Sequence, residues 1–314
     1  MNRLPQFVAA GEALTDLLRS GPAAWSSQAG GSAWNVARVV AKLGIPSAFA
    51  GAVSRDVFGA ELAAATSAAG LDPRFLQQVE RAPLLAVVHE LEPPRYFFIG
   101  DDSADLHFDA AQLPRGWQRA ARWVHFGGIS LAREPLAGKL LALAAELKAQ
   151  GAAISYDPNF RAMMDERYDA TLQRMAALAD VIKVSDADLR GLFRLAPDAD
   201  AQACSSALAG LRKLNPAATI LYTLGQQGAR LLRHGHAWHA PAPRVSVTDS
   251  IGAGDASIGA LLFSLMQYPM REDGAHLRFA VAAGAAACTA AGASPPSLAQ
   301  VESLLVAAHL PEAG

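Results

Sequence analysis

The residues best placed for chemistry lie near the carboxyl end of the chain, in the segment Asp249-Ser250-Ile251-Gly252-Ala253-Gly254-Asp255. A short apolar run precedes this segment, and a long helical pattern, ASIGALLFSLM, follows its glycines. Small residues at a helix N-terminus let backbone amides approach an anion closely, and the helix dipole favours negative charge there. The segment therefore predicts a phosphate-binding loop at the start of a helix.

Asp255 lies just inside this expected helix, beside the predicted phosphate. A carboxylate there repels the phosphate unless it has a separate task, and taking a proton from an attacking hydroxyl is such a task. The other explanation is an ordinary first-turn acid that interacts well with the helix dipole. Both explanations stay open at this point, and the first predicts phosphoryl transfer to an alcohol.

Two common nucleotide-binding motifs do not describe the glycines. A dinucleotide fingerprint requires Gly-x-Gly-x-x-Gly after the first strand, whereas Gly252-Ala253-Gly254-Asp255 lies near the C-terminus and precedes further helices. A Walker A loop requires Gly-Lys-Ser/Thr, whereas Gly138-Lys139 continues into Leu140. Phosphoryl transfer by this chain therefore needs a different loop from the P-loop.

A second glycine-rich segment, Gly30-Gly31-Ser32-Ala33-Trp34-Asn35, opens the first expected helix. Consecutive glycines allow close approach by a ligand, and Asn35 offers both donors and an acceptor to a polyol. A plain loop-to-helix turn also explains this segment.

Short β-rich runs alternate with Ala/Leu-rich helical runs along most of the chain. The expected strands are Phe7–Ala10, Ser47–Ala52, Trp123–Phe126, Ile154–Asp157, Val181–Val184 and Thr219–Thr223. The expected helices include Ala33–Leu43, Val57–Ala69 and Glu134–Gln150, and three more follow at Ala253–Gln267, Ala275–Ala290 and Leu298–Ala308. This alternation predicts an α/β fold with a mostly parallel sheet between two helical layers, a three-layer α/β/α arrangement.

Two regions depart from the alternation. Leu84–Glu90 and Arg95–Ile99 flank Pro93-Pro94 and predict a β-hairpin, while Ala13–Ala29 is a polar stretch before the first helix. Together they predict a small lid formed by about residues 12–30 and 84–104 of a single domain spanning 1–314, although two ordinary surface insertions explain them as well. After Thr223, short strands are expected at Arg230–Arg233, Ala237–Ala240 and Arg244–Val247.

Polar or glycine-rich residues follow several of the expected strands. In open α/β sheets, ligands bind outside the carboxyl ends of the strands, so these residues are expected to converge on one site. The strand ends are Gly11-Glu12 with Asp16 nearby, Asp157-Pro158-Asn159-Phe160-Arg161, Ser185-Asp186-Ala187-Asp188, Thr223-Leu224-Gly225 and the segment ending at Asp255.

Composition narrows the function classes. The 314 residues are 52% hydrophobic and 18% charged, with Lys+Arg 27 against Asp+Glu 29, which argues against disorder and against a nucleic-acid surface. The apolar stretch Phe279–Ala293 is short and rich in Ala and Gly, so a buried helix is expected rather than a membrane span. Glu12 and Asp16 interrupt the N-terminal apolar run, so we expect no signal peptide. The two cysteines, Cys204 and Cys288, have no metal-binding spacing, and a reducing cytoplasmic location is expected.

Taken together, the two glycine-rich segments resemble a known family. GGSAWNVARVVAKLGIPSAFAGAVSRDVFG resembles the first signature of the PfkB (ribokinase-like) carbohydrate kinases, and DSIGAGDASIGALL resembles the second. Their order and separation also match, as do the segments Asp157-Pro158-Asn159, Lys183-Val184-Ser185 and Thr223-Leu224-Gly225-x-x-Gly228. The resemblance covers essentially the whole chain and implies a ribokinase-like fold, with a β-lid that pairs in many members to form a homodimer.

The resemblance also implies roles for individual residues. Asp255 matches the catalytic base that activates the sugar hydroxyl, and the amides of Gly252, Ala253 and Gly254 match the anion hole for the transferring phosphoryl group. Sugar-binding positions match Asp16, Gly31 and Asn35, and Arg161 is a further basic candidate near the sugar. ATP-site positions match Lys183, Ser185, Thr223, Gly225 and Gly228.

For metals, the resemblance implies Mg²⁺ held mainly through phosphate oxygens and water. Ser185-Asp186-Ala187-Asp188 replaces the usual Asn-x-x-Glu, so Asp188 is expected to assist Mg²⁺ only indirectly. A monovalent cation such as K⁺ is implied at the positions that match Asp249, Ile251, Ala287 and Gly292.

Two further departures concern the sugar. Trp34 stands where a small residue is usual, and it is expected to narrow the sugar pocket or stack on the ring. Ile99-Gly100 replaces an aromatic-Arg pair that precedes Ser-Ala-Asp in fructokinase-like and sugar-acid kinases. Arg161 is then the remaining basic candidate, and pairing with Asp165 or Glu166 is its alternative role.

The resulting hypothesis is an ATP-dependent kinase of the fructokinase-like branch, acting on fructose or a close relative. A 2-keto-3-deoxygluconate kinase is disfavoured because a sugar acid needs a cationic partner that Gly100 does not supply. A ribokinase is a further alternative within the family. A sugar- or nucleotide-binding regulator without catalysis is the alternative of another class, and the intact Asp255 argues against it.

Overall fold

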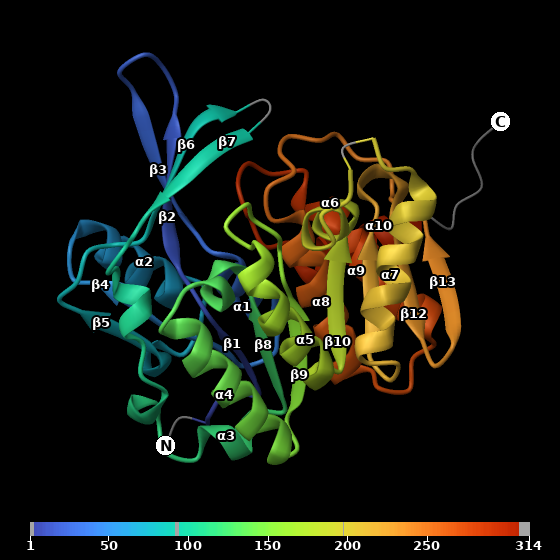
Figure 1. Ribbon diagram of the computed structural model, residues 1–314, viewed down its shortest axis with the longest axis horizontal. Helices are drawn as coiled ribbons and strands as arrows, with labels where there is room; N and C mark the ends of the chain where they lie inside the picture. Colours follow the sequence, from blue (N-terminus) through green and yellow to red (C-terminus); the bar gives the residue numbers. More distant parts are fainter. Residues whose placement is uncertain (1–2, 92–93, 197, 308–314) are drawn as a thin grey trace.

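A large central sheet organises the molecule (Figure 1). In the computed structural model, which describes residues 3–91, 94–196 and 198–307, this sheet has nine strands in the order β13-β12-β11-β10-β9-β8-β1-β4-β5. They are β1 (Phe7–Ala10), β4 (Ser47–Ser54), β5 (Leu76–Val79), β8 (Trp123–Gly127), β9 (Ala153–Asp157), β10 (Val181–Ser185), β11 (Thr219–Thr223), β12 (Ala229–Arg233) and β13 (His236–Ala240). Neighbours from β5 to β11 pair in parallel, whereas β12 and β13 are antiparallel.

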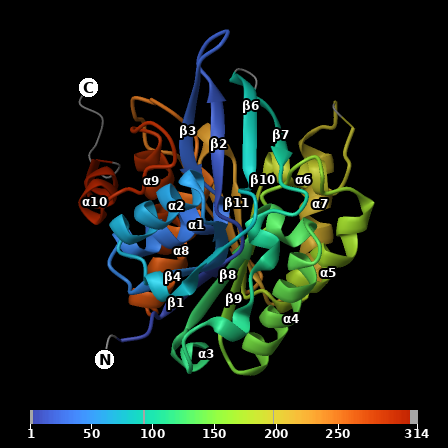
Figure 2. The same ribbon diagram turned by 90° about the vertical axis from the view of Figure 1, so that its left-hand side faces the viewer.

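Helices cover both faces of this sheet (Figure 2). One layer contains α4 (Leu136–Ala149), α5 (Asp169–Leu178), α6 (Asp186–Leu192) and α7 (Ala201–Leu214), with the short α3 (Trp117–Ala120) near its end. The other contains α1 (Ser32–Lys42), α2 (Val57–Ala68), α8 (Ala253–Gln267), α9 (Asp273–Ala287) and α10 (Leu298–Ala307). The predicted three-layer α/β/α fold with a mostly parallel sheet is confirmed.

Each central strand contributes side chains to both layers. Val8 and Ala10 of β1 pack in the core beneath α4, whereas Phe7 and Ala9 pack in the core beneath α1 and α8. This alternation follows from the two-residue period of a strand. Strands buried on both faces account for the high hydrophobic content, and no helix in the described ranges is both long and apolar enough to cross a membrane.

A second sheet of four strands stands above the carboxyl ends of the central strands (Figure 1). Its order is β3 (Trp25–Gly30), β2 (Leu14–Arg19), β6 (Leu85–Leu91) and β7 (Pro94–Ile99). We call it the lid sheet. It joins the two segments expected to form a lid, and residues 14–30, expected only as a polar stretch, form a hairpin within it. Pro93 lies outside the described residues.

Other boundaries differ little from expectation, with one exception. The helices begin and end within three residues of the predicted positions, although Ala308 lies outside the described residues. Single-turn 3₁₀ helices occur at Pro73–Phe75, Ala104–His107, Ala110–Gln112, Gly128–Ala132, Glu166–Tyr168 and Gly225–Gln227. The predicted strand at Arg244–Val247 is wrong, because no strand is formed there. Pro241 and Pro243 lack the N–H that ladder pairing requires, and the segment lines a cavity instead.

Candidate active site

A cavity of about 1060 Å³ lies between the lid sheet and the carboxyl ends of the central strands. Its size exceeds that of most single small-molecule sites, so it has room for two ligands side by side. Most of the predicted site residues line it, namely Asp16, Gly31, Asn35, Arg161, Lys183, Ser185, Thr223, Gly225, Gly228, Ile251, Gly252, Ala253, Gly254 and Asp255. Four predicted site residues are not among those that line it, namely Asp188, Asp249, Ala287 and Gly292.

Gly252 is the residue that turns the chain into α8. It caps the helix with a left-handed φ of +78°. A Cβ at this position would lie 2.7 Å from the Cβ of Ala293 and 2.8 Å from its Cα, so there is no room for a side chain. The Ala253 amide donates to the carbonyl oxygen of Ser250 at 3.3 Å, and Gly252, Ala253, Gly254 and Asp255 all line the cavity at this helix N-terminus. This is the arrangement of an anion-binding loop.

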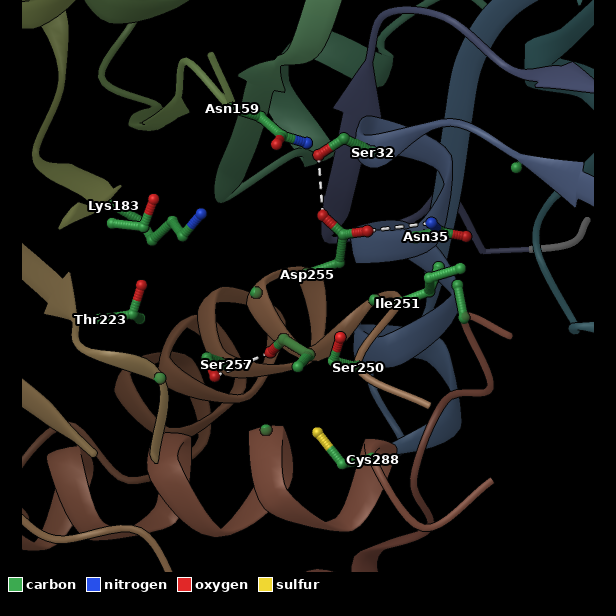
Figure 3. Close-up of a pocket in the computed structure, with 18 of the residues that line it drawn as sticks. Ser32, Asn35, Asn159, Lys183, Thr223, Ser250, Ile251, Asp255, Ser257 and Cys288 are labelled. Atoms are coloured by element: carbon green, nitrogen blue, oxygen red, sulfur yellow. Dashed lines mark hydrogen bonds between the residues drawn. The ribbon is translucent and has the colours of Figure 1, made fainter. Parts of the chain in front are cut away.

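Asp255 projects into the cavity from the first turn of α8 (Figure 3). The Ser32 hydroxyl donates to its Oδ1 at 2.8 Å, and the Asn35 side-chain amide donates to its Oδ2 at 2.9 Å. Arg38 donates to the Oδ1 of Asn35 at 3.2 Å, which fixes the amide so that its NH₂ faces Asp255. The carboxylate is therefore held by two donors in one orientation, as a proton acceptor requires.

Close packing of two helices brings these donors to Asp255. A Cβ on Gly259 of α8 would lie 2.8 Å from Cγ1 of Val39 on α1. Gly259 is one turn after Asp255, and Val39 is one turn after Asn35. Because Gly259 has no side chain, α8 packs closely against α1 at Val39. This close packing sets the distance between the Asp255 carboxylate and the Asn35 amide one turn away.

Burial and charge have opposite effects on Asp255. Removal from water raises the pKa of its carboxyl, whereas the bonds from Asn35 and Ser32 and the charges of Lys183 and Arg161 lower that pKa. A carboxyl with a raised pKa is a stronger base than a free aspartate, provided that it stays ionised.

Gly31 places the start of α1 against the end of β1. Its φ is +115°, and a Cβ there would lie 2.6 Å from the carbonyl oxygen of Glu12. The close approach carries Ser32 and Asn35 to the cavity wall. The neighbouring Gly30 leaves room for the carboxylate of Asp16, which would lie 2.3 Å from a Cβ at that position.

Asp16 and Arg161 both line the cavity, and the charge of Arg161 acts on the Asp16 carboxyl. Burial raises the pKa of Asp16 to about 6, and the charge of Arg161 opposes this shift. Nη1 of Arg161 donates to the side-chain and backbone oxygens of Asn159, at 2.7 and 3.0 Å. The expected alternative, pairing with Asp165 or Glu166, is wrong. Arg161 bonds to Asn159 and Phe160 instead, and Asp165 pairs with Arg167 at 2.7 Å.

The opposite end of the cavity is built from the ends of β10 and β11. Ser185 is the N-cap of α6 and forms a capping box with Asp188. After Thr223, Gly225 and Gly228 both adopt positive φ, and a Cβ on Gly228 would lie 2.0 Å from the carbonyl oxygen of Ala240. Gly225 and Gly228 line this end of the cavity together with the first residues of α8.

Asp188 is turned away from the cavity. It is 4% exposed, and its oxygens accept bonds from the backbone amides of Ser185 (2.7 Å) and Phe160 (2.8 Å). Its carboxylate also lies 3.4 Å from the ammonium of Lys183. Within the described ranges, no group of three or more His, Cys, Asp or Glu side chains is arranged to hold a metal ion.

The predicted monovalent-cation residues lie together behind the loop. Asp249 accepts from the backbone amide of Ile251 and from that of Gly292, both at 2.9 Å. The amide of Thr248 donates to the carbonyl oxygen of Cys288 at 2.8 Å. Residues 248–252 are thereby held against the end of α9, where Ala287 lies.

Trp34 does not act as expected. Its ring is 1% exposed, and its indole N–H donates to the Thr66 hydroxyl on α2 at 2.9 Å. The expectation that Trp34 narrows the sugar pocket or stacks on the sugar ring is therefore wrong, because Trp34 does not line the cavity. Consecutive residues of a helix point about 100° apart. Asn35 points toward Asp255, so the preceding Trp34 points away from the cavity, toward Thr66 on α2.

The loop around Gly100 has a basic partner that the sequence did not indicate. Arg133 donates to the carbonyl oxygen of Gly100 and to the Ser103 hydroxyl. It also lies 3.7 Å from the carboxylate of Asp105. Arg133 does not line the cavity, so it secures this loop rather than contacting a ligand directly.

Two cavity residues had no predicted role. Ser32 belongs to the second glycine-rich segment, but its partner Asp255 is 223 positions away. Glu12 was expected at the site only as part of the strand end Gly11-Glu12, which follows β1. It is 2% exposed and accepts a bond from the Ser130 amide at 3.0 Å.

The buried Glu12 predicts a pH-dependent stability. Burial raises its pKa from 4.5 to about 7, so the stability associated with its protonated form is complete below pH 4.5 and is lost as pH rises through 7. One pKa unit corresponds to about 1.4 kcal/mol, so the loss is on the order of 3 kcal/mol. We expect Glu12→Gln to gain stability relative to wild type at a pH above 7 but not below 4.5. Urea unfolding of both proteins at the two pH values checks this, and an equal difference at both contradicts it.

Comparison with known proteins agrees with this geometry. A family model described as pfkB family carbohydrate kinase matches residues 9–300. The fructokinase of Escherichia coli is 31% identical over 293 residues, which cover 90% of this chain and 93% of that protein. The crystal structure of fructokinase with bound ATP from Xylella fastidiosa matches with a TM-score of 0.86 and 29% identity, over 98% of this chain and 100% of that one. The fructokinase from Vibrio cholerae O395 in fructose-, ADP- and calcium-bound form matches with a TM-score of 0.81 and 26% identity, over 96% and 99% of the two chains. With its ribokinase-like α/β fold, the chain belongs to the pfkB family of carbohydrate kinases.

Proposed function

We propose that this protein transfers the γ-phosphoryl group of ATP to a hydroxyl of fructose. The observation that carries the proposal is the Asp255 carboxylate, held by Ser32 and Asn35 directly beside the glycine-rich start of α8. A carboxylate next to an anion-binding loop suits proton removal from an alcohol that attacks a phosphate. The fructokinase relatives support fructose as the alcohol.

In this mechanism, the sugar lies beneath the lid sheet and ATP lies along the ends of β10 and β11. Asp255 accepts the proton of the attacking hydroxyl, and the amides of Gly252, Ala253 and Gly254 stabilise the charge on the transferring group. Asp16, Gly31, Asn35 and Arg161 hold the sugar, while Lys183, Ser185, Thr223, Gly225 and Gly228 form the nucleotide side. The lid sheet excludes water, which strengthens every charge interaction in the site.

The side chains present fit a magnesium ion that ATP brings with it. Mg²⁺ prefers phosphate oxygens and water, and the described residues offer no dedicated carboxylate cage. When bound, Mg²⁺ neutralises charge on the phosphates. Asp188 assists the binding of this ion only indirectly. It accepts hydrogen bonds from the amide and the hydroxyl of Ser185 and does not face the phosphates itself.

A monovalent cation is a second proposal for this site. Ile251 lines the cavity, and Asp249 ties its segment to Gly292 beside Ala287 at the end of α9. A cation bound by carbonyl oxygens between these segments would hold the loop that contains Gly252. We therefore expect K⁺ to raise kcat relative to a bulky organic cation at equal ionic strength.

A substrate panel tests the proposed function. ADP release is measured with fructose, ribose, other aldoses, 2-keto-3-deoxygluconate and nucleosides. We expect fructose to give the highest kcat/KM. A higher value for ribose or for the sugar acid would reassign the substrate, and binding of sugar and ATP with no turnover on any compound would favour a regulator.

Arg161 provides a prediction about substrate binding. Its guanidinium is the cation beside Asp16 in the sugar end of the cavity, and a hydrogen bond to a charged group contributes about 1.5–3 kcal/mol. We expect Arg161→Ala to raise KM for fructose by about 10- to 100-fold, with a smaller effect on kcat. Arg167→Ala, which removes an exposed arginine paired with Asp165, is the matched control. A loss confined to acid substrates would instead support the sugar-acid kinase.

The outer face of the lid sheet supports a proposed homodimer. Leu17, Val87 and Phe97 are paired in one row on the face opposite the cavity. Phe97 and Ile99 are 51% and 50% exposed, which leaves an apolar patch for a second copy. Light scattering should give a dimer for wild type and a monomer for the Phe97→Glu, Ile99→Glu double variant. Met270→Glu, at a residue 94% exposed outside the lid sheet, should leave the dimer intact.

We also propose a cytoplasmic location. Cys204 and Cys288 are both free thiols, which suits a reducing compartment. ATP and sugar phosphates are found in that compartment as well.

A further inference from the structure

Lys183 is a buried cation on β10, directly behind the phosphate-binding loop. Its side chain is 6% exposed, and its ammonium lies 3.2 Å from a carboxylate oxygen of Asp157 and 3.4 Å from one of Asp188. Those two carboxylates raise the pKa of Lys183 against the opposing effect of burial, so the ammonium stays charged. A buried cation between two fixed acids is expensive to desolvate, which calls for a functional reason.

The ammonium lies against the loop itself. A Cβ added to Gly254 would be 3.2 Å from Nζ of Lys183, so the ammonium lies next to the space that a side chain would take at the residue before Asp255. Figure 3 shows the amine end of Lys183 turned toward Asp255, on the side opposite Asn35. The ammonium is therefore close to Asp255 without donating a hydrogen bond to it.

Other charged groups also face Asp255. Arg38 lies on α1 and Arg161 lies on the loop after β9, and both are cations. Asp157 on β9 is an acid whose pKa burial raises to about 7, so its negative charge is present above that pH. Arg38 is stacked on the Trp34 ring and bonded to Asn35, and Arg161 is held by Asn159. Lys183 is the cation whose own position is set by a pair of buried carboxylates.

We propose that Lys183 is the positioning residue that keeps Asp255 ionised, and that Asp157 and Asp188 hold its ammonium behind Gly254 for this purpose. Asp188 is anchored by the backbone amides of Ser185 and Phe160, and Asp157 accepts from the amide of Asn159 at 2.9 Å. The ammonium is thus fixed by the ends of two neighbouring strands. Burial raises the pKa of Asp255, and the fixed positive charge of Lys183 opposes this rise. The inference rests on the proposed function, because it explains how that base is kept ready.

The test measures the ionisation of Asp255 directly. The NMR chemical shift of its carboxyl carbon is followed against pH, and the signal is assigned by its loss in Asp255→Asn. We expect Lys183→Met to raise the midpoint by about one to three pH units. Asp157→Asn, which removes a negative charge but keeps an oxygen for the Asn159 amide, should lower it. The double variant changes no net charge, so its midpoint should return toward that of wild type.

The outcomes separate a charge effect from a purely structural one. Shifts of opposite sign in Lys183→Met and Asp157→Asn support the proposal, and Lys183→Arg should restore most of the wild-type midpoint. Unchanged midpoints, or shifts of the same sign, overturn it. If Lys183→Met does not fold, the other two variants still test the proposal. Only a charge effect lowers the Asp255 midpoint in Asp157→Asn and leaves it nearly unchanged in Lys183→Arg.

Kinetics provide a second readout. The acidic limb of the kcat profile with fructose should move with the midpoint in each variant, while KM for fructose changes little. An acidic limb that stays in place while the NMR midpoint moves would overturn the link to catalysis. The proposed function and the proposed role of Lys183 are tested by different results. Absence of turnover by the wild type on every sugar contradicts the proposed function, whereas the NMR titration tests the role of Lys183 without substrate.

Discussion

Replacing Asp255 with Asn should lower kcat by about 10²- to 10⁴-fold, because the variant has no group to accept the proton of the sugar hydroxyl. The Asn35 amide can still donate to the oxygen of the new side chain, and the Ser32 hydroxyl can accept from its NH₂, so both bonds can be kept. KM for the sugar should therefore change little. Steady-state kinetics with fructose and ATP measure both constants.

The same substitution should raise stability at neutral pH. Burial raises the pKa of Asp255, so the stability of the folded state is greatest below the unfolded pKa and is lost as pH rises through the folded pKa. The side chain of Asp255→Asn does not ionise, so the variant does not lose stability in this way. A higher melting temperature together with a lower kcat is the expected pair of results. Wild-type turnover in Asp255→Asn would contradict the role of base, and a collapsed fold would contradict the account of its bonds.

Gly252→Ala is the second variant expected to have a large effect. Its φ of +78° disfavours any side chain, and the new methyl would meet Ala293 at 2.7 Å. Relief of this contact has to displace the first amides of α8. Since loss of one anion-hole donor lowers kcat by about 10²- to 10³-fold, we expect a decrease of that size.

Gly70→Ala is a matched control for backbone strain. Gly70 has a φ of +73°, and no heavy atom lies within 4 Å of a Cβ built there. The control should lose about 1–2 kcal/mol of stability from the left-handed conformation and keep its kcat. Unfolding midpoints and kcat for both variants separate strain from displacement of the loop. Equal losses of kcat in both variants would contradict a specific role for the loop.

The elements with local signals could be predicted from the sequence. The loop at Gly252 and Gly254 combines small residues, a following helix and an acid, and all of these lie within a few positions. The parallel strands also have local signals, since their continuous apolar runs reflect burial on both faces. These features were sufficient to place the site at the carboxyl ends of the strands.

Features that depend on distant partners could not be predicted in the same way. The hairpin of β2 and β3 has a polar sequence, and it is stabilised by pairing of residues 15–18 with residues 85–88. Trp34 finds its partner Thr66 on a different helix, so its position in the motif did not reveal its direction. The role of Ser32 depends on where α8 lies.

The bonds around Asp255 also have a consequence for the folding of the chain. Ser32 and Asn35 are 223 and 220 positions before Asp255, so the base is oriented only after both ends of the chain have come together. Contacts of such separation form late and slowly. During synthesis, the first glycine-rich segment emerges long before its partner exists. With Asp255 as the proposed base, kinase activity would be a measure of completed folding, because a partly folded chain has no oriented Asp255 carboxylate.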